Sequence, residues 1–256
     1  SAKICVVLVS LIFLLLSCVE TTSKNEDLIS LIPQNTDIIL RINDINSIKN
    51  KFQNDELLKN LYFPKDVRLK VKNLVNDSLN NQIIAFSNFG KEEKAITVIH
   101  KRTKDSSYLK YEKIMYSGKP IFKFKKGNTE FYKTFIQNNT IVGDSRIIIE
   151  NCIRNHQQQK KGINDDNFNE IIGTADQERG INLFLKGDPK LASKSIFKNL
   201  PLFPKILESW SNLDLDIEND LIEIDGAFKI RDSLGEVSGL LKNSEPIEFL
   251  LNKSIP

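Results

Sequence analysis

The chain has 256 residues, of which 40% are hydrophobic and 27% are charged, and its formal net charge is +3. This balance is typical of a globular protein and excludes a disordered, fibrous or polytopic membrane protein. The near-equal numbers of basic and acidic side chains, 36 and 33, give no reason to expect a nucleic-acid partner. Three cysteines exclude a disulfide-rich scaffold, and two histidines leave little material for a histidine-built metal or catalytic site.

The amino terminus carries a short apolar run. Lys3 precedes an almost unbroken apolar run, Ile4 to Leu16, and Ser17 and Cys18 follow it. A membrane-spanning helix needs about 20 apolar residues, so this run predicts a secretory signal instead. Its end, Leu15 to Cys18, resembles the bacterial lipobox. The resemblance implies cleavage between Ser17 and Cys18, and attachment of a diacylglyceryl lipid to the Cys18 sulfur. A plain secretory signal cut elsewhere and an uncleaved single-pass anchor remain as alternatives.

The lipobox reading divides the chain into residues 1–17 as signal peptide, 18–27 as a flexible tether and 28–256 as an envelope domain. Val19 follows the modified cysteine in place of an aspartate, which in the enterobacterial sorting rule favours the outer membrane. Cys152 is then the last free thiol of the mature domain, so no intramolecular disulfide can form. A lone thiol in an oxidising compartment is expected to be buried.

In the first half of the domain, the sequence predicts a strand, then two helices and then a run of strands. Pro33 precedes a β-branched strand at 37–42, and Asn43 and Asp44 are N-cap candidates for a helix over about 45–60. A second apolar stripe predicts a helix over 67–75. Alternating apolar residues separated by turn signals then predict further strands. These strands are 82–89, 95–100, 111–116, 121–125, 130–136 and 140–142.

The second half mixes helices and strands. Asp144 and Ser145 are expected to open a helix that runs to about Gln159. The elements expected after it are an amphipathic piece at 168–172, a strand at 181–185, a helical segment at 189–211 interrupted by Pro201 and Pro204, a hairpin of 213–218 with 221–230, and a helix at 246–253. The order predicts an α+β fold, a mainly antiparallel sheet meander with packed helices.

Two repeats extend this organisation. Residues 37–54 and 139–156 share one plan, a strand followed by Asn or Asp and then an amphipathic helix, which predicts two related strand–helix units. The closing residues 253–256 resemble the Ile32-Pro33 opening, so we expect residues 28–256 to be the N-terminal part of a longer chain.

The opening at 32–43 and the junction at 141–145 resemble an uncharacterised bacterial envelope family, a domain of unknown function. The resemblance implies a fold of the kind described above, and it supplies no catalytic residues.

The side chains capable of chemistry do not form a recognisable catalytic motif. Glycine spacings for a phosphate loop and the glycine-x-serine-x-glycine elbow are absent from the sequence. His100 and His156 are expected at the solvated surface. Cys152 and His156 have helical i, i+4 spacing, but Cys152 falls on an apolar stripe, which favours burial over use as a nucleophile.

Two charged stretches have both a structural and a functional interpretation. Residues 214–225 have spacings faintly like a calcium loop, but a hairpin with an acidic outer face explains them better. Residues 119–133 interleave lysines with aromatic residues. This pattern could form a stacking platform for single strands or polyanionic glycans, but a strand pair with apolar residues facing the core and lysines facing water is favoured.

The sequence therefore predicts a non-enzymatic, lipid-anchored envelope protein that acts as a binding or scaffolding module. The expected partners are a membrane, through the lipid on Cys18, and an envelope protein or glycan; no nucleic acid, cofactor or metal is expected. The alternative is a carrier or binder of an apolar or glycan ligand, held in a cleft between sheet and helices. A hydrolase built on carboxylates of the acidic hairpin is the least favoured hypothesis.

Overall fold

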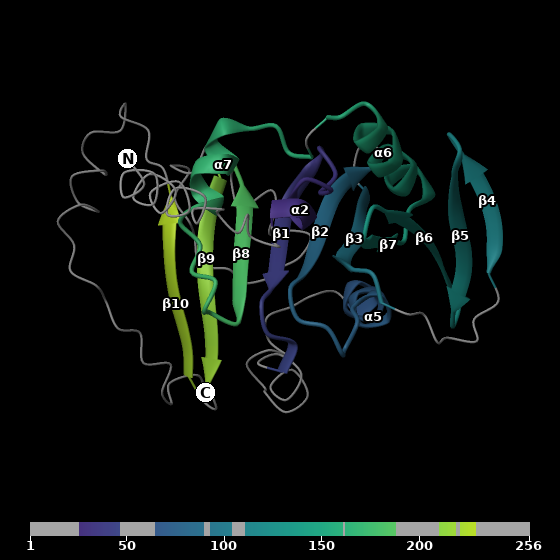
Figure 1. The fold of residues 1–256 in the computed structure, drawn as a ribbon. Helices are drawn as coiled ribbons and strands as arrows, with labels where there is room; N and C mark the ends of the chain where they lie inside the picture. The colour runs from purple at the N-terminus through teal and green to yellow at the C-terminus, as the bar shows by residue number, and fades with distance from the viewer. Residues whose placement is uncertain are drawn as a thin grey trace, which may run out of the picture.

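The computed structural model describes residues 26–46, 65–89, 93–103, 111–160, 162–187, 210–218 and 221–228. Within these residues the molecule is dominated by one ten-stranded antiparallel sheet (Figure 1). The strand order is β10-β9-β8-β1-β2-β3-β7-β6-β5-β4. The strands are β1 (Thr36–Ile42), β2 (Gln82–Phe89), β3 (Glu93–Lys101), β4 (Glu112–Tyr116), β5 (Lys119–Lys126), β6 (Thr129–Ile136), β7 (Asn139–Gly143), β8 (Ile181–Lys186), β9 (Trp210–Glu218) and β10 (Leu221–Phe228).

The described helices are few, and they lie on both faces of the sheet (Figure 1). Helices α2 (Glu26–Ile29), α6 (Arg146–Gln157) and α7 (Asp166–Ile172) contribute to one apolar cluster, and α5 (Lys65–Leu74) to the other. We call these two sides of the sheet the α6 face and the α5 face. None of the described helices is long and apolar enough to cross a membrane.

The two apolar clusters follow from strand alternation, because successive side chains point to opposite faces. Sheet residues in the cluster of the α6 face include Ile39, Ile83, Ile99, Ile141, Phe184 and Trp210. Sheet residues in the cluster of the α5 face include Ile38, Ile84, Val98, Phe124, Val142 and Leu183. The central strands are therefore apolar on both sides, so the mainly antiparallel sheet predicted from the sequence is confirmed as the main feature of the fold.

The predicted strands and the helices at 67–75, 145–159 and 168–172 match described elements within a few residues at each end. One prediction is wrong at its end. Trp210 and Ser211, assigned to a helical segment at 189–211, begin strand β9 and pair with Lys186 and Leu185. Trp210 is buried against Phe168 of α7, with ring centroids 4.7 Å apart. This packing fixes Trp210 in the strand.

Several predictions lie outside the described residues. They are the signal peptide at 1–17, the tether up to residue 25, the helix at 45–60 beyond Asn46, the segment 189–209 and the helix at 246–253.

Asp144, at the junction between β7 and α6, contacts both strand β3 and helix α5. The sequence assigns Asp144 and Ser145 to the start of this helix, and the N-cap residue is Ser145, whose side chain makes no capping bond. The Asp144 carboxylate instead accepts a hydrogen bond from the Ile96 backbone N–H at 2.8 Å. It also pairs with the Lys70 ammonium of α5 at 2.9 Å. Asp144 therefore fixes β3 and α5 against the junction.

Candidate functional site: a pocket on the α5 face

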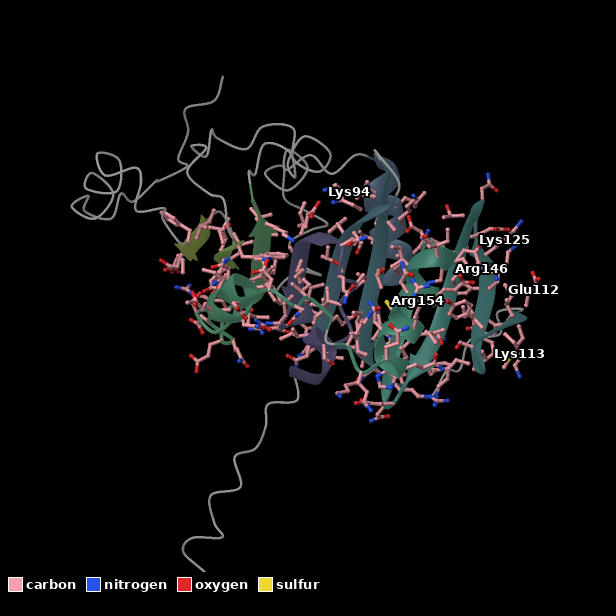
Figure 2. The ribbon with its side chains drawn as sticks, turned by 90° about the horizontal axis from the view of Figure 1, so that it is seen from above. Lys94, Glu112, Lys113, Lys125, Arg146 and Arg154 are labelled. Atoms are coloured by element: carbon pink, nitrogen blue, oxygen red, sulfur yellow. The ribbon has the colours of Figure 1, made fainter. Side chains whose placement is uncertain are left out.

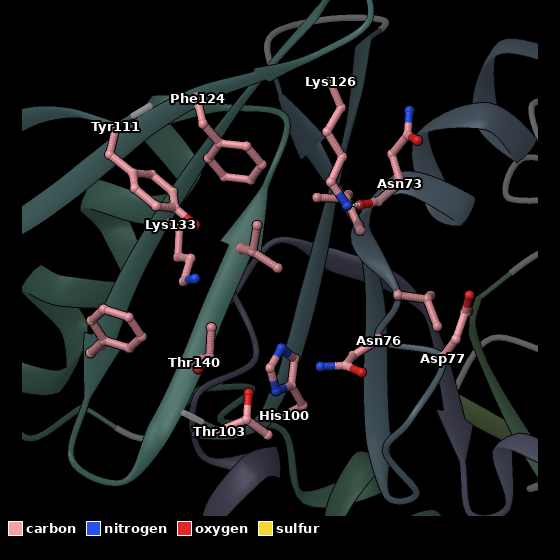
Figure 3. A pocket seen from close by; sticks show the side chains of 14 residues that line it. Asn73, Asn76, Asp77, His100, Thr103, Tyr111, Phe124, Lys126, Lys133 and Thr140 are labelled. Carbon is pink, nitrogen blue, oxygen red and sulfur yellow. Dashed lines mark hydrogen bonds between the residues drawn. The ribbon is translucent and has the colours of Figure 1, made fainter. Parts of the chain in front are cut away.

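A pocket of about 300 Å³ lies on the α5 face, where the end of α5 meets the strands β3, β5, β6 and β7 (Figure 3). Two sides of it have different chemistry: one is polar backbone and amide groups, and the other is aromatic rings and lysines. Its lining residues are Asn73, Leu74, Val75, Asn76, Asp77, His100, Thr103, Tyr111, Phe124, Lys126, Lys133, Phe135, Thr140 and Val142.

The polar side is the turn that follows α5, and the fully buried side chain of Gln82 holds it in place. The Gln82 amide accepts from the Asn76 backbone N–H at 2.9 Å and donates to the Asn76 and Leu79 carbonyls at 2.7 and 2.6 Å. The Asn76 side-chain oxygen accepts from the Ser78 backbone N–H at 3.0 Å. Its oxygen is thus occupied, and its amide nitrogen points toward His100 (Figure 3).

The opposite side combines aromatic rings with two lysines. The rings of Tyr111 and Phe124 meet edge to face at a centroid distance of 5.6 Å. The Lys133 ammonium lies 5.4 Å from the ring centroids of both Tyr111 and Phe135, which is within cation–π range. The Lys126 ammonium closes the gap to α5 by donating to the Asn73 carbonyl at 2.6 Å. The lysines are therefore held at the pocket wall by neighbouring groups.

His100 lies in this pocket, so the expectation that it is a solvated surface residue is wrong. Its exposed fraction is 6%. Its Nδ1 lies 2.7 Å from the Lys101 carbonyl oxygen. Because a carbonyl can only accept, Nδ1 carries the hydrogen, and in the neutral ring Nε2 is an acceptor. Burial lowers the pKa of His100, and the positive charge of Lys133 lowers it further, against the raising effect of the Lys101 bond.

The basic stretch 119–133 is only partly as expected. Lys125 is exposed on the α6 side of β5 and pairs with Glu130 at 3.5 Å, as expected for a lysine facing water. Figure 2 shows it at the outer end of the sheet. Lys126 and Lys133 instead share the α5 face with Phe124 and line the pocket. The apolar and charged residues do not separate by face, because the lysines alternate with the aromatic residues only over 122–125.

The predicted burial of Cys152 is confirmed. Its exposed fraction is 3%, and it packs on the inner side of α6 with Ile148, Ile149 and Ile153. Burial raises the pKa of the Cys152 thiol to about 12, so the nucleophilic thiolate is scarce at neutral pH. His156 is half-buried, not fully at the surface as expected.

Three carboxylates of the β9–β10 hairpin surround Arg179, a cation that was not predicted as part of this cluster. The Arg179 guanidinium lies 2.8 Å from carboxylate oxygens of Glu223 and Asp225 and 3.7 Å from Asp216. The hydrogen bond from Arg179 lowers the pKa of Glu223. These carboxylates lie on an exposed face, but they converge on one side chain and do not splay apart as expected.

Asp214 departs from the predicted acidic outer face, because it is buried with an exposed fraction of 5%. Its carboxylate accepts from the Asn182 amide at 2.6 Å and from the Asp176 backbone N–H at 3.0 Å. Asn182 in turn accepts from the buried Arg41 guanidinium at 2.9 Å. Among the described residues no group of three or more His, Cys, Asp or Glu side chains is placed to hold a metal ion.

Ser17 and Cys18 lie outside the described residues, so the lipidation site stays a prediction. The pocket residues were missed because they come from segments far apart in the sequence. One signal was available: the Lys–Phe stretch 119–133 supplies three of the lining side chains, Phe124, Lys126 and Lys133.

Comparisons of the chain with protein-family models, with curated proteins and with solved structures find no match.

Proposed function

We propose that this chain is a non-enzymatic binding protein of a bacterial envelope, which takes a small ligand in the pocket on the α5 face. The observation that carries the proposal is the pocket itself, a hollow of about 300 Å³ lined by aromatic rings, lysines and an amide. Ligand sites combine apolar surface with a few convergent polar groups in this way. The pocket therefore favours the alternative that was predicted from the sequence, a protein that binds a ligand, over a purely scaffolding role.

The lining supports binding more than catalysis. His100 can transfer protons, and the Lys101 carbonyl orients its ring, but the lining places no carboxylate beside it that would stabilise the imidazolium. The Asp77 carboxylate is turned away from His100 (Figure 3). The Cys152 thiol lies in the cluster of the α6 face, away from the pocket. The lining residues thus include a histidine, but neither a carboxylate beside it nor the Cys152 thiol.

The envelope location rests on the amino-terminal residues. A diacylglyceryl or triacyl group on Cys18 would bury many methylenes, each contributing about 0.8 kcal/mol, and would hold the domain stably at a membrane. Of the expected tether at 18–27, Glu26 and Asp27 lie in helix α2, so the residues between Cys18 and Glu26 would link the lipid to the domain. Val19 favours the outer membrane. An envelope glycan or a fragment of one is a suitable ligand class in that location.

We also propose the finer part of the fold prediction, which is an α+β fold that contains two related strand–helix units. In one unit β1 leads through Asn43 and Asp44 to helical residues Ile45 and Asn46, and in the other β7 leads through Asp144 and Ser145 to α6.

An obstructed pocket tests the proposal. Thr103 is exposed at the rim, so Thr103→Trp adds a large side chain to the opening without touching the buried core. Lys160→Trp is the matched control, because Lys160 is also exposed and does not line the pocket. Both variants and the wild type are screened by ¹H–¹⁵N NMR against a library of small ring compounds.

We expect ligands whose shift changes cluster on His100, Lys133 and Asn76, and loss of these changes in Thr103→Trp alone. If no compound perturbs these residues, or if Thr103→Trp binds like the wild type, the pocket is not a ligand site.

A further inference from the structure

We propose that the ligand is a small carboxylate carried on a six-membered ring, and that His100 takes up a proton when this anion binds. This inference rests on the proposed function, since it names the ligand class of the same pocket. The shared chemistry is an anionic carboxylate beside a ring. A sugar acid and an aromatic acid both provide it, and the experiment below distinguishes these two sources.

The charge of the pocket lining favours an anionic ligand. The titratable groups that line the pocket are Asp77, His100, Tyr111, Lys126 and Lys133. The two lysines outweigh the one carboxylate, and the figure shows that carboxylate turned away from His100 (Figure 3). A binding site with this excess of positive charge attracts anions and discriminates against cations.

The pocket lining also offers hydrogen-bond donors. The Asn76 amide nitrogen points into the pocket and can only donate (Figure 3). The hydroxyls of Thr103 and Thr140 can donate as well. A ligand that satisfies these groups must be rich in acceptors, which a carboxylate is because its two oxygens accept about four hydrogen bonds.

The shape of the pocket favours a ligand that contains a ring. Tyr111, Phe124 and Phe135 supply ring surface on the wall opposite the turn after α5. A flat or chair-shaped ring can pack on such surface, and its substituents then reach the polar side. Ligand pockets usually measure about 300 to 1,000 Å³, so a pocket of about 300 Å³ holds one substituted ring and not a polymer segment.

The proton uptake follows from the geometry of His100. Nδ1 donates to the Lys101 carbonyl, and the Nε2 edge of the ring is turned to the pocket interior (Figure 3). In the empty pocket, burial and Lys133 favour the neutral ring. Lys101 at the end of the same strand, Arg102 directly after it and Lys126 on β5 add positive charge, and Asp77 adds the single negative charge among the pocket-lining residues.

A bound carboxylate reverses this balance, because an anion near Nε2 favours the imidazolium. The ring takes a proton from the solvent, and Nε2–H donates to a carboxylate oxygen while the ligand stays ionised. Binding and protonation of His100 therefore support each other, so that affinity rises as the pH falls through the range in which histidine titrates.

Isothermal titration calorimetry of the full chain tests the proposal with four probes: D-glucuronate and its neutral counterpart D-glucose, and benzoate with its neutral counterpart benzyl alcohol. We expect at least one acid to bind about tenfold or more tightly than its neutral counterpart. Affinity should be several-fold higher at about pH 5.5 than at about pH 7.5. Titrations at about pH 6.5 in two buffers of different ionisation enthalpy should show net proton uptake. A preference for D-glucuronate identifies a sugar acid as the source, and a preference for benzoate identifies an aromatic acid.

Variants separate the two parts of the proposal. Lys133→Met and Asn76→Asp should each weaken binding of the acid about tenfold or more, since one removes a positive charge and the other replaces a donor by an anion. His100→Gln should keep measurable binding but lose both the pH dependence and the proton uptake. Lys125→Met is the control, because Lys125 is an exposed lysine of the same strand pair that faces away from the pocket.

Several results would overturn the inference. If neither acid binds, or if the neutral probes bind as tightly as the acids, the anion assignment is wrong; neutral binding that Thr103→Trp abolishes would leave the pocket as a ligand site. If the pH dependence persists in His100→Gln, the proton goes elsewhere. Should Lys133→Met fail to fold, Asn76→Asp still tests the charge argument, because the aspartate keeps the acceptor that bonds Ser78.

Discussion

His100 and Cys152 are both buried in their uncharged forms, and burial is the largest cause of the pKa change at each. The direction differs because burial disfavours whichever form is charged. It lowers the pKa of the His100 imidazolium and raises that of the Cys152 thiol to about 12. Each shift makes the free energy of unfolding depend on pH. The shift of His100 acts in the acidic range, and the shift of Cys152 acts in the alkaline range.

His100 should make the ligand-free protein sensitive to acid. In the unfolded chain it takes a proton near pH 6.5, whereas in the folded protein its lowered pKa keeps it neutral to lower pH. Its contribution to stability is therefore present above about pH 6.5 and is lost as the pH falls toward the folded pKa. Urea unfolding between about pH 5 and pH 8 should show this loss, and His100→Gln should show a smaller one. Equal acid sensitivity in the two proteins would contradict the assignment to His100.

Cys152 should make the free energy of unfolding fall at alkaline pH. Its pKa rises from 9.0 in the exposed state to about 12 in the fold, so its contribution is complete below pH 9 and is lost as the pH rises toward 12. Cys152→Ala should cost stability near neutral pH by leaving a small cavity, and the gap to the wild type should narrow above about pH 9. The folded thiol should also resist iodoacetamide at about pH 8 and react once urea unfolds the chain. Rapid alkylation of the folded protein would show that the thiol is accessible.

The burial of Cys152 could be predicted from the sequence, but the burial of His100 could not. Cys152 sits on a helical apolar stripe, and helical spacing identifies the inner side directly. His100 lies one residue before the end of β3, and both faces of this strand are covered, so alternation does not tell which polar residues are enclosed. What encloses His100 is the turn after α5 and the strands β5 to β7, which a local pattern cannot bring together.

At the scale of elements, Gly162 is the point at which the segment after α6 meets the turn between α2 and β1. Its backbone N–H donates to the Ser30 carbonyl at 2.9 Å. A Cβ at this position would lie 2.9 Å from the Ser30 oxygen and closer still to that of Ile32, both of them backbone atoms. Gly162→Ala should therefore lower the free energy of unfolding by about 1 to 3 kcal/mol.

Gly173→Ala is the matched control for that measurement. Gly173 has ordinary right-handed helical geometry, and the nearest backbone oxygen to its Cβ would be 3.3 Å away. Gly173→Ala should change the free energy of unfolding by less than about 1 kcal/mol. Equal losses in the two variants, measured by urea unfolding, would contradict the close packing at Gly162.

The hairpin of β9 and β10 depends on Arg179. This side chain faces carboxylates of Asp176, Asp216, Glu223 and Asp225 at distances of 2.8 to 3.8 Å. Arg179→Gln should destabilise the protein at low salt, because the carboxylates then repel one another, and added NaCl should shrink the loss by screening.

Arg146→Gln provides the comparison, since Arg146 pairs with the single carboxylate of Glu150. It should have a small effect with little salt dependence. If both variants respond to salt alike in urea unfolding, the carboxylates around Arg179 do not act as a repelling group.

Element prediction succeeded where the residue pattern is local. The strand β5 and the hairpin of β9 and β10 follow from alternation and turn residues. The start of β9 was missed, because Trp210 follows a segment with two prolines and a helical pattern, and its strand conformation is set by pairing with β8 and packing on α7. Arg179 was missed for a similar reason: it lies outside the hairpin in the sequence.

At the scale of the whole molecule, the ten-stranded sheet determines where the pocket lies. The order places β3 beside β7, so His100 comes next to Thr140, and the meander β7-β6-β5 brings in Lys133 and Phe124. The turn after α5, fixed by Gln82, provides the remaining side. An antiparallel sheet could be predicted from the sequence, but the order of its strands could not, because pairing between distant strands depends on tertiary contacts.

In the proposed function, a lipid on Cys18 holds the ligand-binding domain at a bacterial membrane. The most direct test is the intact mass of the protein isolated from the membrane fraction, for the wild type beside Cys18→Ala. We expect a wild-type chain that begins at Cys18 and carries the mass of a diacylglyceryl or triacyl group, and no such species in the variant. An unmodified chain, either uncleaved or cut at another position, would contradict it.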